Sequence, residues 1–177
     1  NVSTMGRPTK ITPDPIIDAV VELRYSSDMP DDAIFGMIFS QIKEKYEKFT
    51  KLPIADFPDE IKKKDPNLRF SPYYQSELGP YRLNVGPRAI SLSNIIPYSG
   101  WRENYFSEIK ELLHKLEESG VVNKYTRLGI RYIDYFDLDI YDKIKLSVQF
   151  DECQLEVKQQ TFNAVYKNGE FLTRLIV

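Results

Sequence analysis

The sequence predicts one α+β domain, in which two long helices pack on one face of a mainly antiparallel sheet of about seven to eight strands. Two observations predict this fold. Segments that alternate apolar and polar residues outnumber helical segments and are joined by short links. Aromatic residues make up 13% of the 177 residues, with twelve Tyr and ten Phe, and these rings favour half-buried sheet faces. A chain of this length can build a hydrophobic core without disulfide or metal support.

The first predicted elements are an arm and a strand. Residues 1–15 carry three prolines and are expected to form an extended arm before a single domain over 16–177. A strand is predicted over 16–25, with an apolar face and a face that carries Glu22 and Arg24. The apolar face consists of Ala19, Val21, Leu23 and Tyr25.

A helix is predicted over 31–49. Pro30 is tolerated at its start, and Asp31 and Asp32 suit the positive end of the helix dipole. Apolar residues recur at steps of three and four, which is typical of a helix that buries one side. They are Ile34, Met37, Ile38, Ile42, Tyr46 and Phe49. The following segment, 50–68, is charged and rich in proline, and we expect a loop there with at most one short turn of helix.

Three strands are predicted next, over 69–77, 81–86 and 89–95, separated by Gly-Pro pairs. A second helix is predicted over 100–118, with Ser99 as its N-cap. Its apolar stripe is Tyr105, Ile109, Leu112, Leu113 and Leu116. Gly120 is expected to end this helix in the left-handed conformation.

The last third of the chain is predicted to be β-structure. Strands are expected over 125–136 and 144–150, and a hairpin over 155–166 and 170–177, because Asn168-Gly169 strongly favours a tight hairpin turn. The chain ends inside this apolar strand. We therefore expect the natural protein to continue beyond Val177.

Composition excludes several classes of protein. The net charge is −2 and the pI about 5.6, which disfavours a nucleic-acid binder, since such proteins usually carry a basic surface. The basic run at 62–64 is interpreted as a solvated loop. No apolar run of about 20 residues could span a bilayer, and no signal peptide is recognisable. A single cysteine excludes an intramolecular disulfide, so a cytoplasmic location is expected.

No local pattern predicts a catalytic residue, a metal site or a cofactor. His114 is the sole histidine and is interpreted as a surface residue of the second helix. Cys153 follows two carboxylates, which disfavour a reactive thiolate. Asp137, Asp139 and Asp142 lack the glycine and the final glutamate of a calcium loop, and a solvated turn is the better interpretation.

Four charged residues form the candidate site. Glu22 and Arg24 share one face of the first strand, and Arg127 and Arg131 share one face of a strand predicted to be central. If the two strands are neighbours, Glu22 could pair with Arg131 across the sheet. One interpretation is a solvated or salt-bridged sheet face. The other is a concave surface on which arginines and Tyr hydroxyls hold a carboxylate or phosphate.

Three segments resemble a sporadically distributed prokaryotic family of uncharacterised proteins. Residues 15–25, Pro-Ile-Ile-Asp-Ala-Val-Val-Glu-Leu-Arg-Tyr, are similar to a Pro-Ile-x-Glu-Ala-Val-x-Glu-x-Arg-Phe start, with Asp18 and Tyr25 as departures. Gly100-Trp101 and the Arg-Leu-Gly-Ile-Arg-Tyr-Ile segment 127–133 match later elements in order. The resemblance implies no established activity. It implies a longer protein and horizontally acquired genes, sometimes of defence or toxin-antitoxin type.

The sequence is compatible with two functions. The first is a non-catalytic protein-interaction module that binds a protein partner or its own copy, because Tyr and Arg are enriched at binding hot spots and an edge strand offers a route to strand pairing. The alternative is a protein or enzyme that binds a small anionic ligand through Glu22, Arg24, Arg127 and Arg131.

Overall fold

A computed structural model describes residues 12–66, 68–137 and 161–176. The chain divides into two compact units, residues 1–137 and 138–177. The predicted strand over 144–150, most of the predicted arm and the first part of the strand predicted from residue 155 lie outside the described residues. A single domain over 16–177 therefore stays a prediction.

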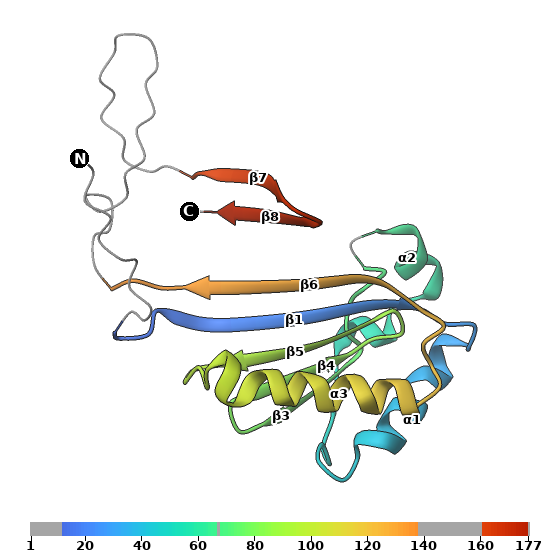
Figure 1. Ribbon diagram of the computed structural model, residues 1–177. Helices are drawn as coiled ribbons and strands as arrows, with labels where there is room; N and C mark the ends of the chain where they lie inside the picture. The colour runs from blue at the N-terminus through green and yellow to red at the C-terminus, as the bar shows by residue number, and fades with distance from the viewer. Residues whose placement is uncertain (1–11, 67, 138–160, 177) are drawn as a thin grey trace, which may run out of the picture. The chain divides into compact units, whose positions relative to one another are not determined.

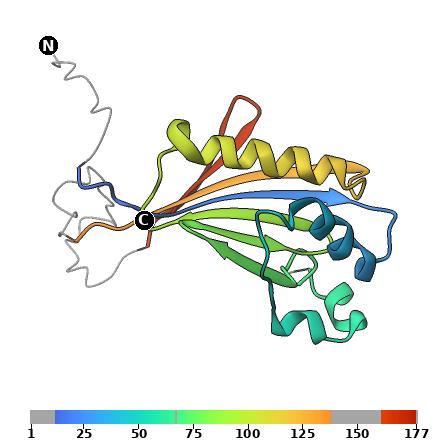
Figure 2. The same ribbon diagram turned by 90° about the horizontal axis from the view of Figure 1, so that it is seen from below.

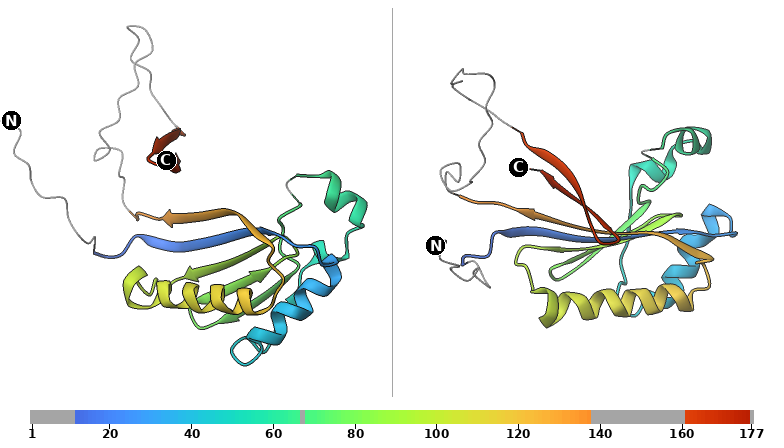
Figure 3. Two further views of the ribbon diagram at one scale, coloured as in Figure 1. Left: turned by 45° about the vertical axis from the view of Figure 1, so that its right-hand side comes forward. Right: turned by 45° about the horizontal axis from the view of Figure 1, so that its top comes forward.

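The first unit contains a six-stranded antiparallel sheet in the order β2-β3-β4-β5-β1-β6 (Figure 1). Its strands are β1 (Ile16–Ser26), β2 (Thr50–Lys51), β3 (Tyr74–Leu78), β4 (Tyr81–Val85), β5 (Ala89–Ile95) and β6 (Lys124–Asp134). Helices α1 (Asp31–Ile42) and α3 (Phe106–Glu118) lie on one side of this sheet, as Figures 2 and 3 show. The α+β class with a mainly antiparallel sheet is confirmed.

Strand β1 separates an apolar face from a polar face, as its alternation predicted. Ala19, Val21 and Tyr25 are buried under the helices, whereas Val20, Glu22 and Arg24 are half-buried on the opposite face. Together with apolar residues of β4, β5, α1 and α3 the buried set forms one hydrophobic core. The polar face is therefore the side of the sheet that the two long helices leave open.

Helix α1 is shorter than predicted, and its apolar stripe is correct except at Met37. It ends at Ile42 instead of residue 49, and a turn follows in which the Tyr46 N–H still donates to the Ile42 carbonyl at 2.9 Å. Ile34, Ile38, Ile42 and Tyr46 are all buried, while Met37 is exposed. The apolar spacing thus identified the core-facing side chains, and the chain keeps them in the core past the end of the helix.

The start of the second helix differs from the prediction. Gly100, at φ 82°, precedes a wide π-helical turn, η2 (Trp101–Tyr105), which leads into α3. Ser99 does not cap the helix. Its N–H and hydroxyl instead donate to the buried Asn94 Oδ1, at 2.8 and 2.7 Å. The side chain predicted as an N-cap therefore fixes the loop after β5. Gly120 ends α3 with φ 68°, as predicted.

Residues 50–73 contain more structure than the predicted loop. They include β2, a 3-10 turn, η1 (Pro53–Asp56), and the short helix α2 (Asp59–Lys64), and β3 begins at Tyr74 instead of residue 69. Lys62 corrects the interpretation of the basic run as a solvated loop. It is buried in α2, where its Nζ lies 2.9 Å from Asp59 Oδ1 and over the Tyr73 ring.

The described part of the second unit is the predicted hairpin. Strands β7 (Asn163–Asn168) and β8 (Phe171–Ile176) pair antiparallel, with Asn168 opposite Phe171. Gly169 has φ 62° in the turn between them, a conformation that glycine adopts without steric cost. The Asn-Gly signal therefore located the turn correctly.

Candidate functional site

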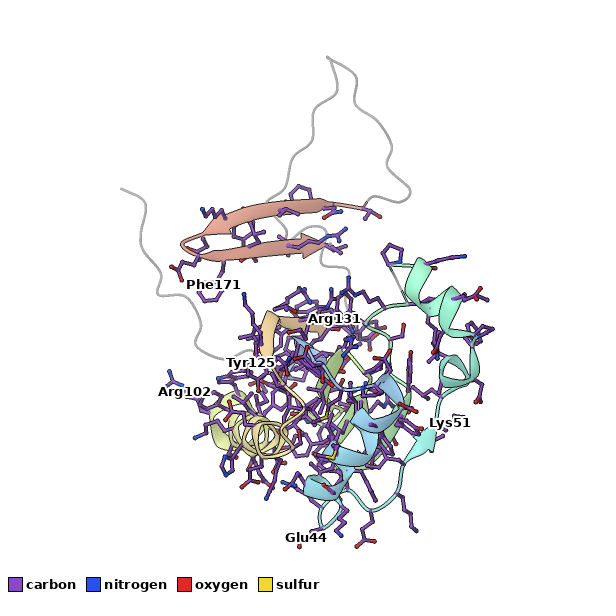
Figure 4. All side chains as sticks on the ribbon, turned by 90° about the vertical axis from the view of Figure 1, so that its right-hand side faces the viewer. Glu44, Lys51, Arg102, Tyr125, Arg131 and Phe171 are labelled. Carbon is purple, nitrogen blue, oxygen red and sulfur yellow. The ribbon has the colours of Figure 1, made fainter. Side chains whose placement is uncertain are left out.

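The four predicted site residues share the open face of the sheet. Strands β1 and β6 pair directly, with Arg24 opposite Arg127, Glu22 opposite Gly129 and Val20 opposite Arg131. Side chains directly opposite each other in an antiparallel pair point to the same face. Figure 4 shows Arg131 on the side of the sheet away from α1 and α3. The expectation that neighbouring strands bring both arginines onto one surface is confirmed.

Glu22 is the centre of an ion-pair cluster on this face. Its Oε1 accepts from Arg24 Nε and from Arg127 Nη1, both at 2.7 Å. The Arg24 guanidinium also lies 4.1 Å from the centroid of the Phe70 ring. A planar guanidinium that bonds a carboxylate while stacking on an aromatic ring is well fixed. Two of the three predicted arginines are thus held by one carboxylate, which is the salt-bridged arrangement weighed above.

The predicted pair between Glu22 and Arg131 is wrong. Glu22 lies opposite Gly129, two residues before Arg131 along β6, so Arg127 reaches it instead. Arg131 Nη2 lies 3.9 Å from Asp18 Oδ2, and the Arg131 side chain is 67% exposed. The second oxygen, Asp18 Oδ1, is buried and has no hydrogen-bond partner among the described residues. Arg131 is therefore the most loosely held of the three arginines.

Gly129 has a role that the sequence did not reveal. A Cβ atom built on it would lie 2.9 Å from Nη1 of Arg127. The Arg127 guanidinium therefore passes over Gly129 on its way to Glu22, and a side chain at position 129 would obstruct it. The sequence shows Gly129 between two arginines, but its role becomes clear only when the register of β6 against β1 is known.

A row of polar side chains on β3, β4 and β5 crosses the open face and ends next to Glu22. Gln75 on β3 donates to Asn84 on β4 at 2.9 Å, and Asn84 donates to Ser91 on β5 at 3.3 Å. Ser91 lies directly opposite Glu22. Sequence reasoning missed this row because its members belong to separate strands. Their alternation with apolar residues within each strand was the available signal.

The other side of β6 is apolar and exposed. Leu128, Ile130 and Tyr132 lie opposite Leu23, Val21 and Ala19. The helices bury Val21 and Ala19, yet Leu128 is 60%, Ile130 51% and Tyr132 44% exposed. The described residues that continue the chain, Tyr135 and Phe136, are exposed as well. Tyr125, near the start of β6, still packs against the core, but from Leu128 to Tyr132 the cover from the helix layer ends at β1.

Strand β6 is the end strand of the sheet among the described residues, whereas the sequence predicted a central one. Among the strands that the structure describes, none pairs with the outer edge of β6. An edge strand presents unpaired N–H and C=O groups, and proteins usually protect such edges by short length, charge, proline or bulges. β6 is eleven residues long, and its pairing with β1 is regular from Arg127 to Ile133, between register shifts near Thr126 and near Ile17. We define the outer edge of β6 with Leu128, Ile130 and Tyr132 as the β6 edge.

A second candidate site is a cleft of about 950 Å³ next to α2. Three of its four cations pair with carboxylates: Arg88 with Asp31 at 2.7 Å, Lys62 with Asp59 at 2.9 Å, and Lys51 with Asp56. The fourth, Arg69, lies over the Phe70 ring. The lining thus carries charges of both signs, and most of its cations are paired. This cleft offers no set of converging cations comparable to an anion site.

The other residues considered from the sequence, a histidine, a cysteine and three aspartates, do not form a catalytic or metal site among the described residues. His114 is exposed on α3, with its Nε2 at 3.3 Å from Glu118 Oε1, which fits its interpretation as a surface residue. Cys153, Asp139 and Asp142 lie outside the described residues. No cluster of three or more potential metal ligands occurs among the residues that are described.

Comparison with protein-family models, curated proteins and solved structures finds no match for this chain. Within the described residues, no helix has both the length and the apolar character needed to cross a bilayer.

Proposed function

We propose that this chain is a non-catalytic protein-interaction module and that a strand of a second polypeptide pairs with the β6 edge. The observation that carries the proposal is the exposure of Leu128, Ile130 and Tyr132, 44–60%, on a long edge strand. Backbone hydrogen bonds along such an edge provide affinity, and pockets or patches for alternate side chains provide specificity.

The energetics favour a strand as the occupant. An added strand would satisfy outward-facing N–H and C=O groups of β6 and would cover three large apolar side chains. Burying apolar surface contributes roughly 25 cal/mol per Å², and ordering the partner offsets part of that gain. Because the backbone groups and the apolar side chains lie on the same strand, one extended segment can engage both.

The open face adds a polar border to this edge. Arg127 and Arg131 project from β6 on the side away from the helices. Glu22 holds Arg127, whereas Arg131 is largely exposed. A partner strand would therefore meet apolar side chains on one side and a cation on the other. This asymmetry would fix the direction and register of the partner.

Site-specific photo-crosslinking in the producing cells tests the proposal. A benzophenone side chain replaces Ile130 in one variant and Ile61 in the matched control, since Ile61 on α2 is 50% exposed and Ile130 51%. We expect adducts that gain the mass of a protein at position 130 and none at position 61. Equal labelling at both positions, or no protein adduct at position 130, contradicts the proposal.

A second candidate function is favoured by Arg131 alone. Its guanidinium lies 3.9 Å from the nearest ion-pair oxygen, on Asp18. Arg131 could therefore hold a carboxylate or phosphate on the open face, and the second function is a protein that binds a small anionic ligand. The test measures the thermal unfolding temperature while the concentration of inorganic phosphate is raised in 20-fold steps. If Arg131 binds the anion, phosphate should raise the unfolding temperature of the wild type and of the control Arg82→Ala, but not that of Arg131→Ala. An equal shift in the two variants contradicts this function.

Membership of the sporadically distributed prokaryotic family, with a cytoplasmic location, is part of the same proposal. Two of the segments that carry the resemblance, 15–25 and 127–133, fall largely on β1 and β6, which are paired strands. The resemblance therefore concentrates on the strand pair that forms the candidate site.

A further inference from the structure

We propose that the polypeptide on the β6 edge is a second copy of this chain, and that the two β6 strands pair antiparallel about a two-fold axis at Ile130. This inference rests on the proposed function, because it names the partner of the same edge. Closed two-fold dimers are the commonest symmetric assemblies of soluble proteins, and they bring one surface patch against itself. The sequence of β6 decides between the possible registers.

Symmetry limits the registers to a few. When a two-fold axis perpendicular to the sheet joins two antiparallel edge strands, one residue lies directly opposite its own copy. Residues at equal distances on either side of it then lie opposite each other. For the middle of β6, the residue on the axis is Leu128, Gly129, Ile130 or Arg131. The side chains that each choice brings together can be derived from the sequence of the strand.

Charge excludes two of these registers. An axis at Gly129 places Arg127 directly opposite Arg131 of the second copy, and does so twice. An axis at Arg131 places this arginine opposite itself. Like charges directly opposite each other in a sheet are destabilising. Glu22 already accepts from Arg24 and Arg127, so two guanidinium groups share its single negative charge before a second copy adds further arginines.

Apolar matching separates the other two. An axis at Ile130 pairs Ile130 with itself and Leu128 with Tyr132 of the second copy, twice, so all three exposed side chains meet apolar partners. On the open face it places Arg131 opposite Gly129, with no charge opposite it. An axis at Leu128 instead places Ile130 opposite Thr126, where the register shift occurs, and Tyr132 opposite Lys124. The Ile130 axis therefore gives three apolar pairs and the Leu128 axis only one.

The regular stretch of β6 is centred on Ile130. With the axis there, Arg127 lies opposite Ile133 of the second copy. The paired stretch 127–133 therefore falls between the two irregularities of the β1–β6 ladder, one at Thr126 and one at Ile17. The regular part of β6 and the apolar part of β6 coincide in this register, which supports the choice of the second copy over an unrelated strand.

Disulfide trapping of the purified full chain tests this register. Cys153→Ser removes the single native thiol, and Ile130→Cys, Leu128→Cys or Tyr132→Cys then introduces one thiol each. Residues directly opposite have Cα atoms about 4.5–5.5 Å apart, within the range that a disulfide bridges. Residue 128 of one copy would lie four residues, roughly 14 Å, from residue 128 of the other. Mild oxidation should therefore give a covalent dimer of Ile130→Cys in at least tenfold higher yield than of Leu128→Cys or Tyr132→Cys.

A double variant keeps the test decisive if Ile130→Cys does not fold. Leu128→Cys with Tyr132→Cys should also form a covalent dimer, because these two positions lie opposite each other across the axis. A dimer from Leu128→Cys alone overturns the register. Sedimentation of the wild-type chain, at the highest soluble concentration and at a 100-fold dilution, gives its mass in solution. If no variant forms a covalent dimer and the mass is that of a single chain at both concentrations, a second copy is not the partner.

Photo-crosslinking and disulfide trapping together distinguish self-pairing from the binding of a different protein. If position 130 forms photo-adducts with a different protein while no disulfide dimer forms, the self-pairing is wrong and the β6 edge stays the binding element. If position 130 gives no protein adduct, or only an adduct within its own chain, both are wrong.

Discussion

Glu22 holds two guanidinium groups on the open side of the sheet, one from its own strand and one from β6. That Glu22, Arg24, Arg127 and Arg131 share a face could be predicted from alternation, because the period of a strand is two. Which arginine pairs with Glu22 could not. The register of β1 against β6 depends on irregularities near Ile17 and Thr126, and nothing in the sequence marks these.

Glu22→Gln should lower the free energy of unfolding by roughly 1–3 kcal/mol, because it removes a half-buried carboxylate that bonds two cations. Urea unfolding measures the change. Glu77→Gln is the matched control on the same face, since Glu77 accepts from Arg82 at 2.7 Å but is exposed. This control should change stability by at most about 0.5 kcal/mol. Equal losses in both variants would contradict the central position of Glu22.

Tyr105 joins the helix layer to the sheet through its hydroxyl. The oxygen accepts from the Val21 N–H at 3.1 Å and lies 2.9 and 2.5 Å from the Ala19 and Leu92 carbonyl oxygens. The sequence identified Tyr105 as an apolar stripe residue but could not reveal that its hydroxyl inserts between β1 and β5. That contact depends on the π-helical turn before α3.

Tyr105→Phe should cost roughly 1–3 kcal/mol of stability, because it leaves a buried N–H without its partner. Tyr125→Phe is the opposite case. The Tyr125 hydroxyl is buried and has no hydrogen-bond partner in the described part of the chain, so its removal should be neutral or stabilising. Chemical denaturation of both variants measures the difference, and a larger loss for Tyr125→Phe would rule out this interpretation.

Several buried tyrosines should make the fold sensitive to alkali. Burial raises the pKa of Tyr46 to about 12, and it raises the pKa values of Tyr25 and Tyr105 further above the ordinary value. Because these folded-state pKa values exceed that of the unfolded chain, near 10, stability should be constant below pH 10 and fall as the pH rises above it. Absorbance at 295 nm should show exposed tyrosines ionising first. Complete ionisation near pH 10 in the folded state would contradict the burial.

Apolar spacing predicted both long helices more reliably than their ends. Tyr46 and Phe49 pack on the core although α1 ends at Ile42. Their spacing therefore predicted their burial correctly but not the end of the helix. Ser99 looked like an N-cap by residue type, but Asn94 engages it. Such ends are decided by tertiary hydrogen bonds, which local propensity does not include.

Two glycines at helix positions should respond oppositely to alanine. Gly36 lies within α1, where an added Cβ meets no atom within 4 Å, so Gly36→Ala should stabilise the protein by about 0.5–1 kcal/mol. Gly120 has φ 68° after α3 and equally open space. Gly120→Ala should therefore destabilise by about 1 kcal/mol through backbone strain alone. Thermal unfolding compares them, and changes of the same sign would contradict these conformations.

The class and layering of the molecule could be predicted from the sequence, whereas the strand order could not. Alternation, the Asn168-Gly169 turn and two apolar stripes predicted an antiparallel sheet with helices on one face. They do not state which strands end the sheet, because pairing partners are chosen by tertiary packing. Arg127 and Arg131 were therefore assigned to a central strand, although β6 stands at the end of the described sheet. The candidate interaction edge depends on this difference.

Native mass spectrometry most directly tests whether the β6 edge binds a polypeptide. The wild-type protein, Ile130→Lys and the control Ile61→Lys would be purified gently from the producing cells and compared. The wild type and Ile61→Lys should each carry the additional mass of a protein or of a second copy, and Ile130→Lys should lose it, because it places a charge in the apolar pairing surface. Bare monomers for all three, or a complex that Ile130→Lys retains, would contradict the account.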